Sequence, residues 1–232
     1  MQDGQERHNF VSHGAGALEE EAYRLIRSSL INGDFTPDSK LSIRGVCAAL
    51  SLSPMAVRAA LRRLVNERAL DAKPSGTAMV PRITRREFSE LAAMRLQSEP
   101  LALTLAVPHL KPAQFERLDA FVAQHEAARL ASDPTGVRQA DTGFLFELYR
   151  SSGSALLLSF IESLWLRRRP MFWEARWALL GSSLGRAPHR HKEIMDALRQ
   201  GRPDLARDFL VEEIRSAGEF LLEAMRFREA TD

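Results

Sequence analysis

The chain has 232 residues, of which 45% are hydrophobic and 27% charged, and a formal net charge of +2 at pH 7. This composition is typical of a globular protein with a buried core, and no apolar stretch approaches the roughly 20 residues that span a bilayer, so no membrane partner is expected. The single cysteine, Cys47, excludes an internal disulfide framework. The N-terminal residues lack the charged and then apolar pattern of a secretory signal, so we expect a cytoplasmic protein.

The first segment with a clear pattern is a helix over residues 18–31. Residues 1–17 are polar and contain glycines, and we expect this tail to be disordered. From Leu18 onward apolar residues recur at helical spacing, and Asn32-Gly33 provides a stop signal.

Residues 41–70 predict a helix-turn-helix. Two short apolar runs at helical spacing, 43–50 and 57–64, are separated by a turn at 51–54. Ser53 is suited to cap the second helix, and Pro54 is suited to its first position. Residues 44–73 contain six basic and two acidic side chains. The positive charge is therefore concentrated where a helix could enter a groove of double-stranded DNA.

A short hairpin after the second helix turns this motif into a winged helix. Residues 70–73 and 77–80 are predicted to be strands, with a turn at Pro74-Ser75-Gly76. The order and spacing of these segments resemble the GntR superfamily of bacterial transcription regulators. The matching residues are 20–30, 31–35 with Pro37, 41–42, 52–64 and 75–77, so the resemblance covers residues 18–82.

The resemblance implies which residues contact DNA. Arg58 would project into the major groove, where an arginine can bind a guanine edge or a phosphate, and Arg44 would contact DNA from the preceding helix. The predicted set is Arg44, Ser53, Met55, Arg58, Arg62, Ser75 and Gly76. The alternative is that the arginines form a solvated face. Because two reading helices must reach successive major grooves, we also expect a homodimer on a palindromic operator.

After a linker at 83–87, residues 88–227 form the second predicted domain. Helices are predicted over 86–106, 112–131, 136–151, 154–168, 170–179, 188–199 and 203–226. The fold class is therefore mainly α, with an N-terminal winged helix-turn-helix, a small β-hairpin wing and a C-terminal all-α helical bundle.

The helical half resembles the FCD effector domain of the FadR branch of the same superfamily. The matching residues are Met94, Arg95, Glu99, Asp141, Phe144, 152–154, His191, Ile194, 197–198, Gly201 and Ala206. This resemblance extends to about residue 220. It implies that the bundle binds a small-molecule effector and forms dimers.

Three polar residues, Asp141, His191 and Glu213, share helical faces with apolar residues and are predicted to point inward. Buried carboxylates are costly unless they are paired or bind a metal. Many FCD domains hold a metal with one aspartate and three histidines, and Asp141 and His191 match two of these positions. Leu145 stands where the second histidine is expected, and Glu213 stands in place of the last. The metal hypothesis is zinc, nickel or manganese on Asp141, His191 and Glu213; the alternative is a metal-free pocket in which His191 pairs with a carboxylate.

The predicted effector is a carboxylate-bearing small molecule. Arg95 could bind its carboxylate or could instead form an i,i+4 bridge to Glu99. The predicted effector-binding residues are therefore Arg95, Asp141, His191 and Glu213. The run 167–169, three arginines at the end of a helix, is interpreted as solvated.

The predicted function is a metabolite-responsive, DNA-binding transcription regulator, a repressor that a small organic acid releases from its operator. One alternative is a regulator with a degraded effector site that acts constitutively. Another is a metal-dependent enzyme that uses Asp141, His191 and Glu213. The sequence lacks HExxH, GxSxG and phosphate-loop motifs, so we expect no enzyme.

Overall fold

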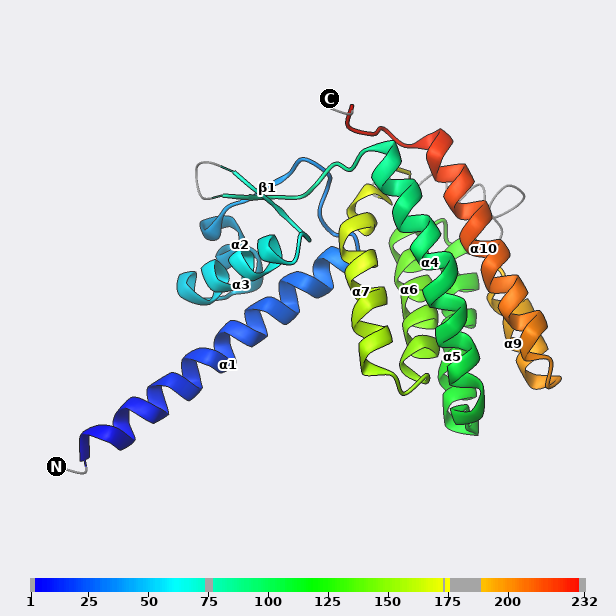
Figure 1. Ribbon diagram of the computed structural model, residues 1–232, viewed down its shortest axis with the longest axis horizontal. Helices are drawn as coiled ribbons and strands as arrows, with labels where there is room; N and C mark the ends of the chain where they lie inside the picture. The colour runs from blue at the N-terminus through cyan, green and yellow to red at the C-terminus, as the bar shows by residue number, and fades with distance from the viewer. Residues whose placement is uncertain (1–2, 74–76, 173, 176–188, 230–232) are drawn as a thin grey trace.

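The computed structural model describes residues 3–73, 77–172, 174–175 and 189–229. Figure 1 shows two parts, an N-terminal unit drawn in blue and cyan and a bundle of long helices drawn in green to red. Within the described ranges, no helix combines the length and the apolar character needed to cross a membrane.

The N-terminal unit begins with the long helix α1 (Asp3–Ile31). Its C-terminal half buries Ala22, Ile26 and Leu30 completely. The helix starts earlier than predicted, so residues 3–17 are helical where the sequence suggested disorder. These residues contain no proline, and an existing helix extends at little cost because each added residue gains one backbone hydrogen bond.

The predicted helix-turn-helix consists of α2 (Ile43–Leu50) and α3 (Pro54–Asn66), with the turn between them. Ser53 caps α3 as predicted, because its side chain accepts a hydrogen bond from the backbone N–H of Ala56. Val57, Ala60 and Leu64 of α3 are buried against α1.

A three-stranded antiparallel sheet completes the winged helix. Strands β2 (Asp71–Ala72) and β3 (Ala78–Met79) form the predicted hairpin. A third strand that the sequence did not indicate, β1 (Lys40–Leu41), pairs with β3 on its other side, with Lys40 opposite Met79. Ser75 and Gly76, the predicted tip of the wing, lie outside the described residues.

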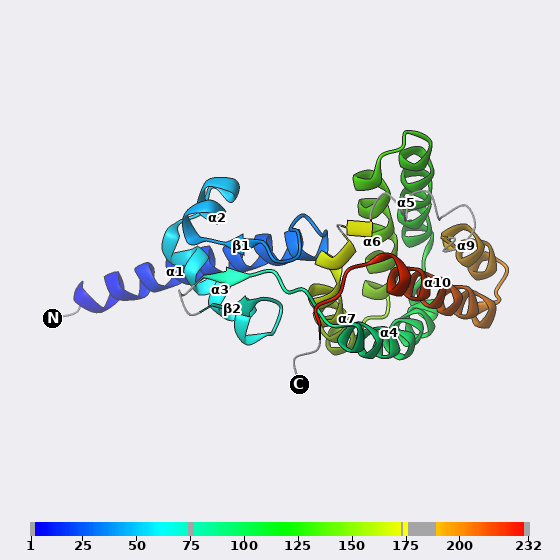
Figure 2. The same cartoon turned by 90° about the horizontal axis from the view of Figure 1, so that it is seen from above.

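The second part is the predicted helical bundle, and Figure 2 shows its helices side by side next to the winged helix. They are α4 (Arg85–Ala106), α5 (Pro112–Leu130), α6 (Pro134–Arg150), α7 (Ala155–Arg168), α9 (His191–Arg199) and α10 (Pro203–Ala224), with 3₁₀ turns η1 (Val107–His109) and η2 (Arg169–Met171). Their core contains the fully buried aromatic side chains of Phe88, Phe144, Tyr149 and Trp165. Most of the helix predicted over 170–179 lies outside the described residues.

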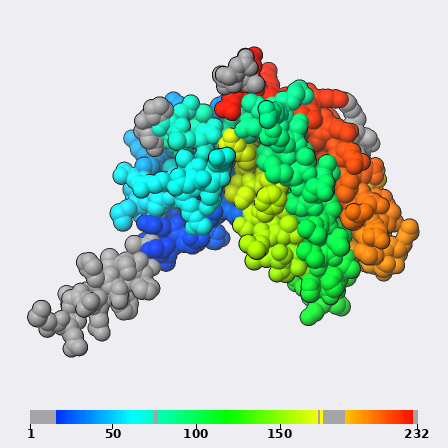
Figure 3. Space-filling model, viewed as in Figure 1, coloured from blue at the N-terminus to red at the C-terminus, as the bar shows by residue number. Residues whose placement is uncertain are grey.

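The segment that joins the two parts is ordered by specific contacts. Ile83 is completely buried, and Thr84 caps α4 in a capping box with Glu87. Residues 83–87, predicted to be a linker, thus comprise the buried Ile83, the capping residue Thr84 and the first turn of α4. In Figure 3 the yellow surface of α7 lies between the cyan winged helix and the green α4.

Candidate metal centre and nucleic-acid interface

The predicted DNA-contacting side chains of α2 and α3 lie on the surface. Arg44, Arg58, Arg62 and Met55 are exposed, and Met55 is 69% accessible although it is apolar. Arg58 and Arg62 line a hollow between α3 and the sheet, together with Lys73. The structure thus brings three cationic side chains to one concave surface, an arrangement suited to the phosphates of a duplex.

The neighbouring Arg63 has a different role, because it holds the unit together. Its guanidinium pairs with Glu20 of α1 at 2.7 Å and with Glu67 at 3.1 Å, and it lies 3.5 Å from the ring centre of Tyr23. Of the basic residues on α3, Arg58 and Arg62 are therefore the ones that remain available for a ligand.

A cavity of about 70 Å³ lies inside the bundle. Residues of α4, α6, α7, η2 and α10 line it, and four of the lining residues are arginines. The lining consists of Arg95, Pro134, Val137, Arg138, Asp141, Leu145, Trp165, Arg168, Arg169, Phe172, His189, Glu213, Ile214 and Ala217.

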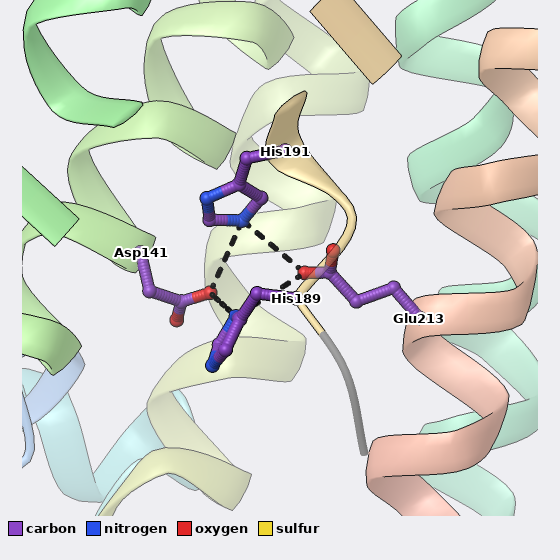
Figure 4. A group of neighbouring side chains, drawn as sticks. All are labelled: Asp141, His189, His191 and Glu213. Atoms are coloured by element: carbon purple, nitrogen blue, oxygen red, sulfur yellow. Dashed lines mark ion pairs between the residues drawn. The ribbon is translucent and has the colours of Figure 1, made fainter. Parts of the chain in front are cut away.

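Four potential metal ligands converge here, three of which line the cavity, and Figure 4 shows their side chains directed toward a common centre. Asp141 comes from α6, His189 from the segment before α9, His191 from the first turn of α9 and Glu213 from α10. One ligand atom from each residue lies within 4.8 Å of all the others. The predicted trio of Asp141, His191 and Glu213 is thus brought together.

The spacing of these atoms fits a metal ion. His191 Nε2 lies 3.2 Å from Glu213 Oε1 and 3.6 Å from Asp141 Oδ1, and His189 Nδ1 lies 3.8 and 3.6 Å from the same two oxygens. Ligand atoms about 2.1 Å from a zinc ion at tetrahedral angles are about 3.4 Å apart. Among the described residues, neither histidine nitrogen has a hydrogen-bond partner although both are buried, so both are available to coordinate a cation.

The second oxygen of each carboxylate is already held by the protein. Asp141 Oδ2 accepts a hydrogen bond from Arg169 Nη2 at 3.2 Å, and Glu213 Oε2 accepts one from the backbone N–H of Arg190 at 2.6 Å. These contacts fix the orientation of both side chains. Asp141 Oδ1 and Glu213 Oε1 are therefore available to coordinate a metal ion. Hydrogen bonds that orient the ligating carboxylates in this way are usual around metal centres.

His189 is the candidate ligand that the sequence did not indicate. The helix predicted over 188–199 would have put residues two positions apart on different faces, so that His189 and His191 would not converge. The helix instead begins at His191, and His189 lies before it. Leu145, which stands at the expected position of a histidine, lines the cavity with its apolar side chain.

The charges of the cluster shift the pKa values of its members. Burial lowers the pKa of His191, but attraction to Glu213 and Asp141 outweighs this effect and raises the pKa to about 10. Burial raises the pKa of both carboxyl groups, and the neighbouring His191 outweighs it and holds each pKa well below its usual range. Without a metal, His191 is therefore an imidazolium ion between two carboxylates at neutral pH.

Arg95, the predicted effector-binding arginine, already has a partner. It is buried and donates two hydrogen bonds to Glu99, with Nη2 at 2.9 Å from Oε2. The i,i+4 bridge considered from the sequence is therefore present, although the Arg95 side chain still lines the cavity.

The three arginines 167–169 are not a solvated helix end, which corrects the prediction. Arg168 and Arg169 are only 2% and 3% exposed. Arg167 donates to the backbone oxygen of Arg68 and to Asp71 of β2, each at 3.0 Å. Arg169 donates a hydrogen bond to Asp141 of α6, and Arg168 packs against the rings of Phe88 and Phe172.

Comparisons with known proteins agree with both halves of the structure. The family model for bacterial regulatory proteins, gntR family, matches residues 18–80, and the model of the FCD domain matches residues 90–216. The HTH-type transcriptional regulator McbR of Escherichia coli K12 is 28% identical over 162 residues, which is 68% of this chain and 73% of that protein.

Two solved structures share the fold. E. coli McbR/YncC has a TM-score of 0.82 and 24% identity, and the comparison covers 89% of this chain and 97% of that chain. A putative GntR transcriptional regulator from Rhodococcus sp. RHA1 has a TM-score of 0.70 and 25% identity, covering 90% of this chain and 99% of that one.

Proposed function

The chain belongs to the gntR family of bacterial regulatory proteins and carries an FCD domain, and on this premise we propose that it is a repressor released from its operator by a small carboxylate. It is a DNA-binding transcription regulator, and the similar proteins are likewise regulators rather than enzymes. The repression, the operator geometry and the effector class are the proposal.

In this proposal α3 enters the major groove and the wing lies over the adjacent backbone. Arg58 and Arg62 are exposed on α3 and line the hollow beside the sheet, and Arg44 is exposed on α2. Ser53 and Met55 lie at the start of α3, the end that approaches base edges in this class of motif. Ser75 and Gly76 are proposed to meet the phosphate backbone or the minor groove.

The proposed operator is palindromic because the regulator acts as a homodimer. An apolar surface on α4 and α7 supports this, with Leu101, Phe160 and Leu156 at 49%, 47% and 87% exposure. Met94, Leu101, Leu157 and Phe160 line one hollow on this surface. A contiguous apolar face of this kind is typical of a surface that a second subunit covers.

The effector is proposed to bind where Asp141, His189, His191 and Glu213 converge, and this convergence is the observation that carries the proposal. These residues would hold a divalent cation such as zinc, nickel or manganese. Such a cation would offer its open coordination positions to a ligand carboxylate. The arginines around the cavity make it attractive to an anion.

Arg138 connects the cavity to the DNA-binding unit. Its side chain lines the cavity. It also donates one hydrogen bond to the backbone oxygen of Gly33 at 2.9 Å and another to Asp34 Oδ1 at 3.2 Å. An anionic effector that attracts this guanidinium would compete with Gly33 and Asp34. We propose that this competition changes the position of the winged helix relative to the bundle.

A regulator that acts constitutively with a degraded effector site is the alternative. The reason to consider it is that Leu145 and Glu213 stand where histidines of the expected metal set would be. His189 supplies a fourth donor in their place, so the geometry favours the effector-responsive function.

The test is the metal content of purified, unchelated protein, measured by mass spectrometry for wild type, His191→Ala and His109→Ala. We expect about one divalent ion per chain in wild type and in His109→Ala, because His109 is an exposed residue of η1. His191→Ala should lose the ion. Equal metal contents in all three proteins, or no metal in any of them, would contradict the metal centre.

A further inference from the structure

Arg168, the last residue of α7, is a buried cation for which the described part of the chain provides no counter-ion. It is 2% exposed and lines the bundle cavity. Within the described ranges, no hydrogen bond or ion pair joins its guanidinium to another residue, and its Nε is buried without a partner. Burial lowers the pKa of Arg168 well below its ordinary value, yet a guanidinium group stays charged in proteins.

The two carboxylates whose charges act on Arg168, Glu99 and Asp141, are already engaged by other groups. Glu99 accepts hydrogen bonds from Arg95, Tyr149 and Trp165. Asp141 accepts one from Arg169 and also faces the two histidines. Arg168 therefore shares their electrostatic field without receiving a contact of its own.

Aromatic packing compensates the charge of Arg168 only in part. Its guanidinium carbon lies 4.3 Å from the ring centre of Phe172 and 5.6 Å from that of Phe88. Such contacts provide no hydrogen-bond acceptor in the plane of the ring, so they do not satisfy the N–H donors of the guanidinium. The donors are thus left for an acceptor that enters the cavity.

We propose that Arg168 binds a second anionic group of the effector, so that the ligand is a small dianion such as a dicarboxylate. This inference rests on the proposed effector site: one carboxylate lies toward Asp141, His189, His191 and Glu213, and the other accepts hydrogen bonds from Arg168. A cavity of about 70 Å³ restricts the ligand to a short chain. Arg168 is then the residue that distinguishes dicarboxylates from monocarboxylates.

The experiment compares ligands that differ only in the second carboxylate. Isothermal titration calorimetry on the full chain uses succinate and glutarate against butyrate. Hydrogen bonds to a buried charged group contribute about 1.5–3 kcal/mol, so one of the dicarboxylates should bind about 10- to 150-fold more tightly than butyrate. Arg168→Met should lose this preference, because the affinity for the dicarboxylate should fall much more than the affinity for butyrate.

Two further variants control for folding and for general electrostatics. Arg207→Met removes a half-exposed arginine of α10 and should preserve the preference. Arg168→Lys retains the charge with fewer donors and should give an intermediate preference. If Arg168→Met fails to fold, the lysine variant and the wild-type comparison still decide the question.

The outcomes separate this inference from the function on which it rests. If butyrate and the dicarboxylates bind wild type equally, or if Arg168→Met weakens both ligand types equally, the role of Arg168 is overturned while the carboxylate site stands. If none of these acids binds wild type, the proposed carboxylate site itself is overturned, and the inference falls with it.

Discussion

The wall of the cavity depends on one carboxylate, Glu99, and its replacement by glutamine gives a quantitative test of the structure. Glu99 is completely buried in α4 and accepts two hydrogen bonds from Arg95. It also accepts one from the Tyr149 hydroxyl at 2.6 Å and one from Trp165 Nε1 at 2.7 Å. The substitution Glu99→Gln keeps the shape of the side chain but removes its charge.

The expected loss of stability is large. A neutral amide leaves Arg95 as a buried charge without its counter-ion and directs an N–H₂ group toward existing donors. Breaking a buried ion pair in this way costs about 3–5 kcal/mol. In a chain of this size, 1 kcal/mol lowers the melting temperature by about 2–4 °C, so the variant should melt roughly 6–20 °C below wild type.

The chain contains a matched control on the same helix. Arg86 and Glu90 form another i,i+4 pair on α4, but their side chains are 88% and 54% exposed. An exposed helical pair contributes about 0.3–0.5 kcal/mol, so Glu90→Gln should barely change the unfolding free energy. Urea unfolding followed by circular dichroism measures both variants. A difference of less than about 1 kcal/mol between them would refute the view that burial makes the Glu99 network essential.

Three further predictions concern DNA binding, assembly and pH. Arg58→Ala should weaken binding to an operator duplex by about 1–3 kcal/mol in fluorescence anisotropy, and unchanged affinity would mean that Arg58 belongs to a solvated face. Phe160→Glu should convert the proposed dimer to monomers in light scattering, whereas Leu130→Glu, at an 84% exposed position of α5, should leave the mass unchanged. The reverse result would place the subunit interface elsewhere. In metal-free protein, the pKa of His191 is about 10 against an ordinary value of 6.5. Its contribution to stability is therefore fully present below pH 6.5 and is lost as the pH rises toward 10, so the urea midpoint should fall over this range. A midpoint that stays constant from pH 6.5 to 10, or that falls equally in His191→Ala, would contradict this assignment.

Local signals in the sequence were sufficient for most of the fold. Ser53 is predictable as a cap because a capping side chain bonds to backbone groups within its own helical turn. Most of the described bundle helices begin and end within a few residues of the predicted bounds, since prolines and glycines mark their ends. Strand β1 could not be predicted because two residues are too few to show an alternation of apolar and polar side chains. Only its pairing with the distant β3 defines it.

The candidate site was predicted less completely, because long-range contacts define it. Asp141, His191 and Glu213 could be found as polar residues on apolar helical faces. His189 could not, since helical periodicity has no meaning for a residue that precedes the helix. The arginines at 167–169 were misinterpreted because a charge run is normally solvated, and only tertiary structure supplies the partners that bury it.

The same arginine run makes the length of α7 critical. Arg167 contacts the sheet of the winged helix, Arg168 faces the cavity and Arg169 holds Asp141. Each of these three adjacent residues makes its contact only when the C-terminal end of α7 has the rotation seen in the structure. Inserting a single residue earlier in α7 would turn this end of the helix by about 100° and misdirect all three side chains together. Conservative substitutions within α7 should thus be tolerated better than insertions or deletions, because only the latter change the rotation of the helix end.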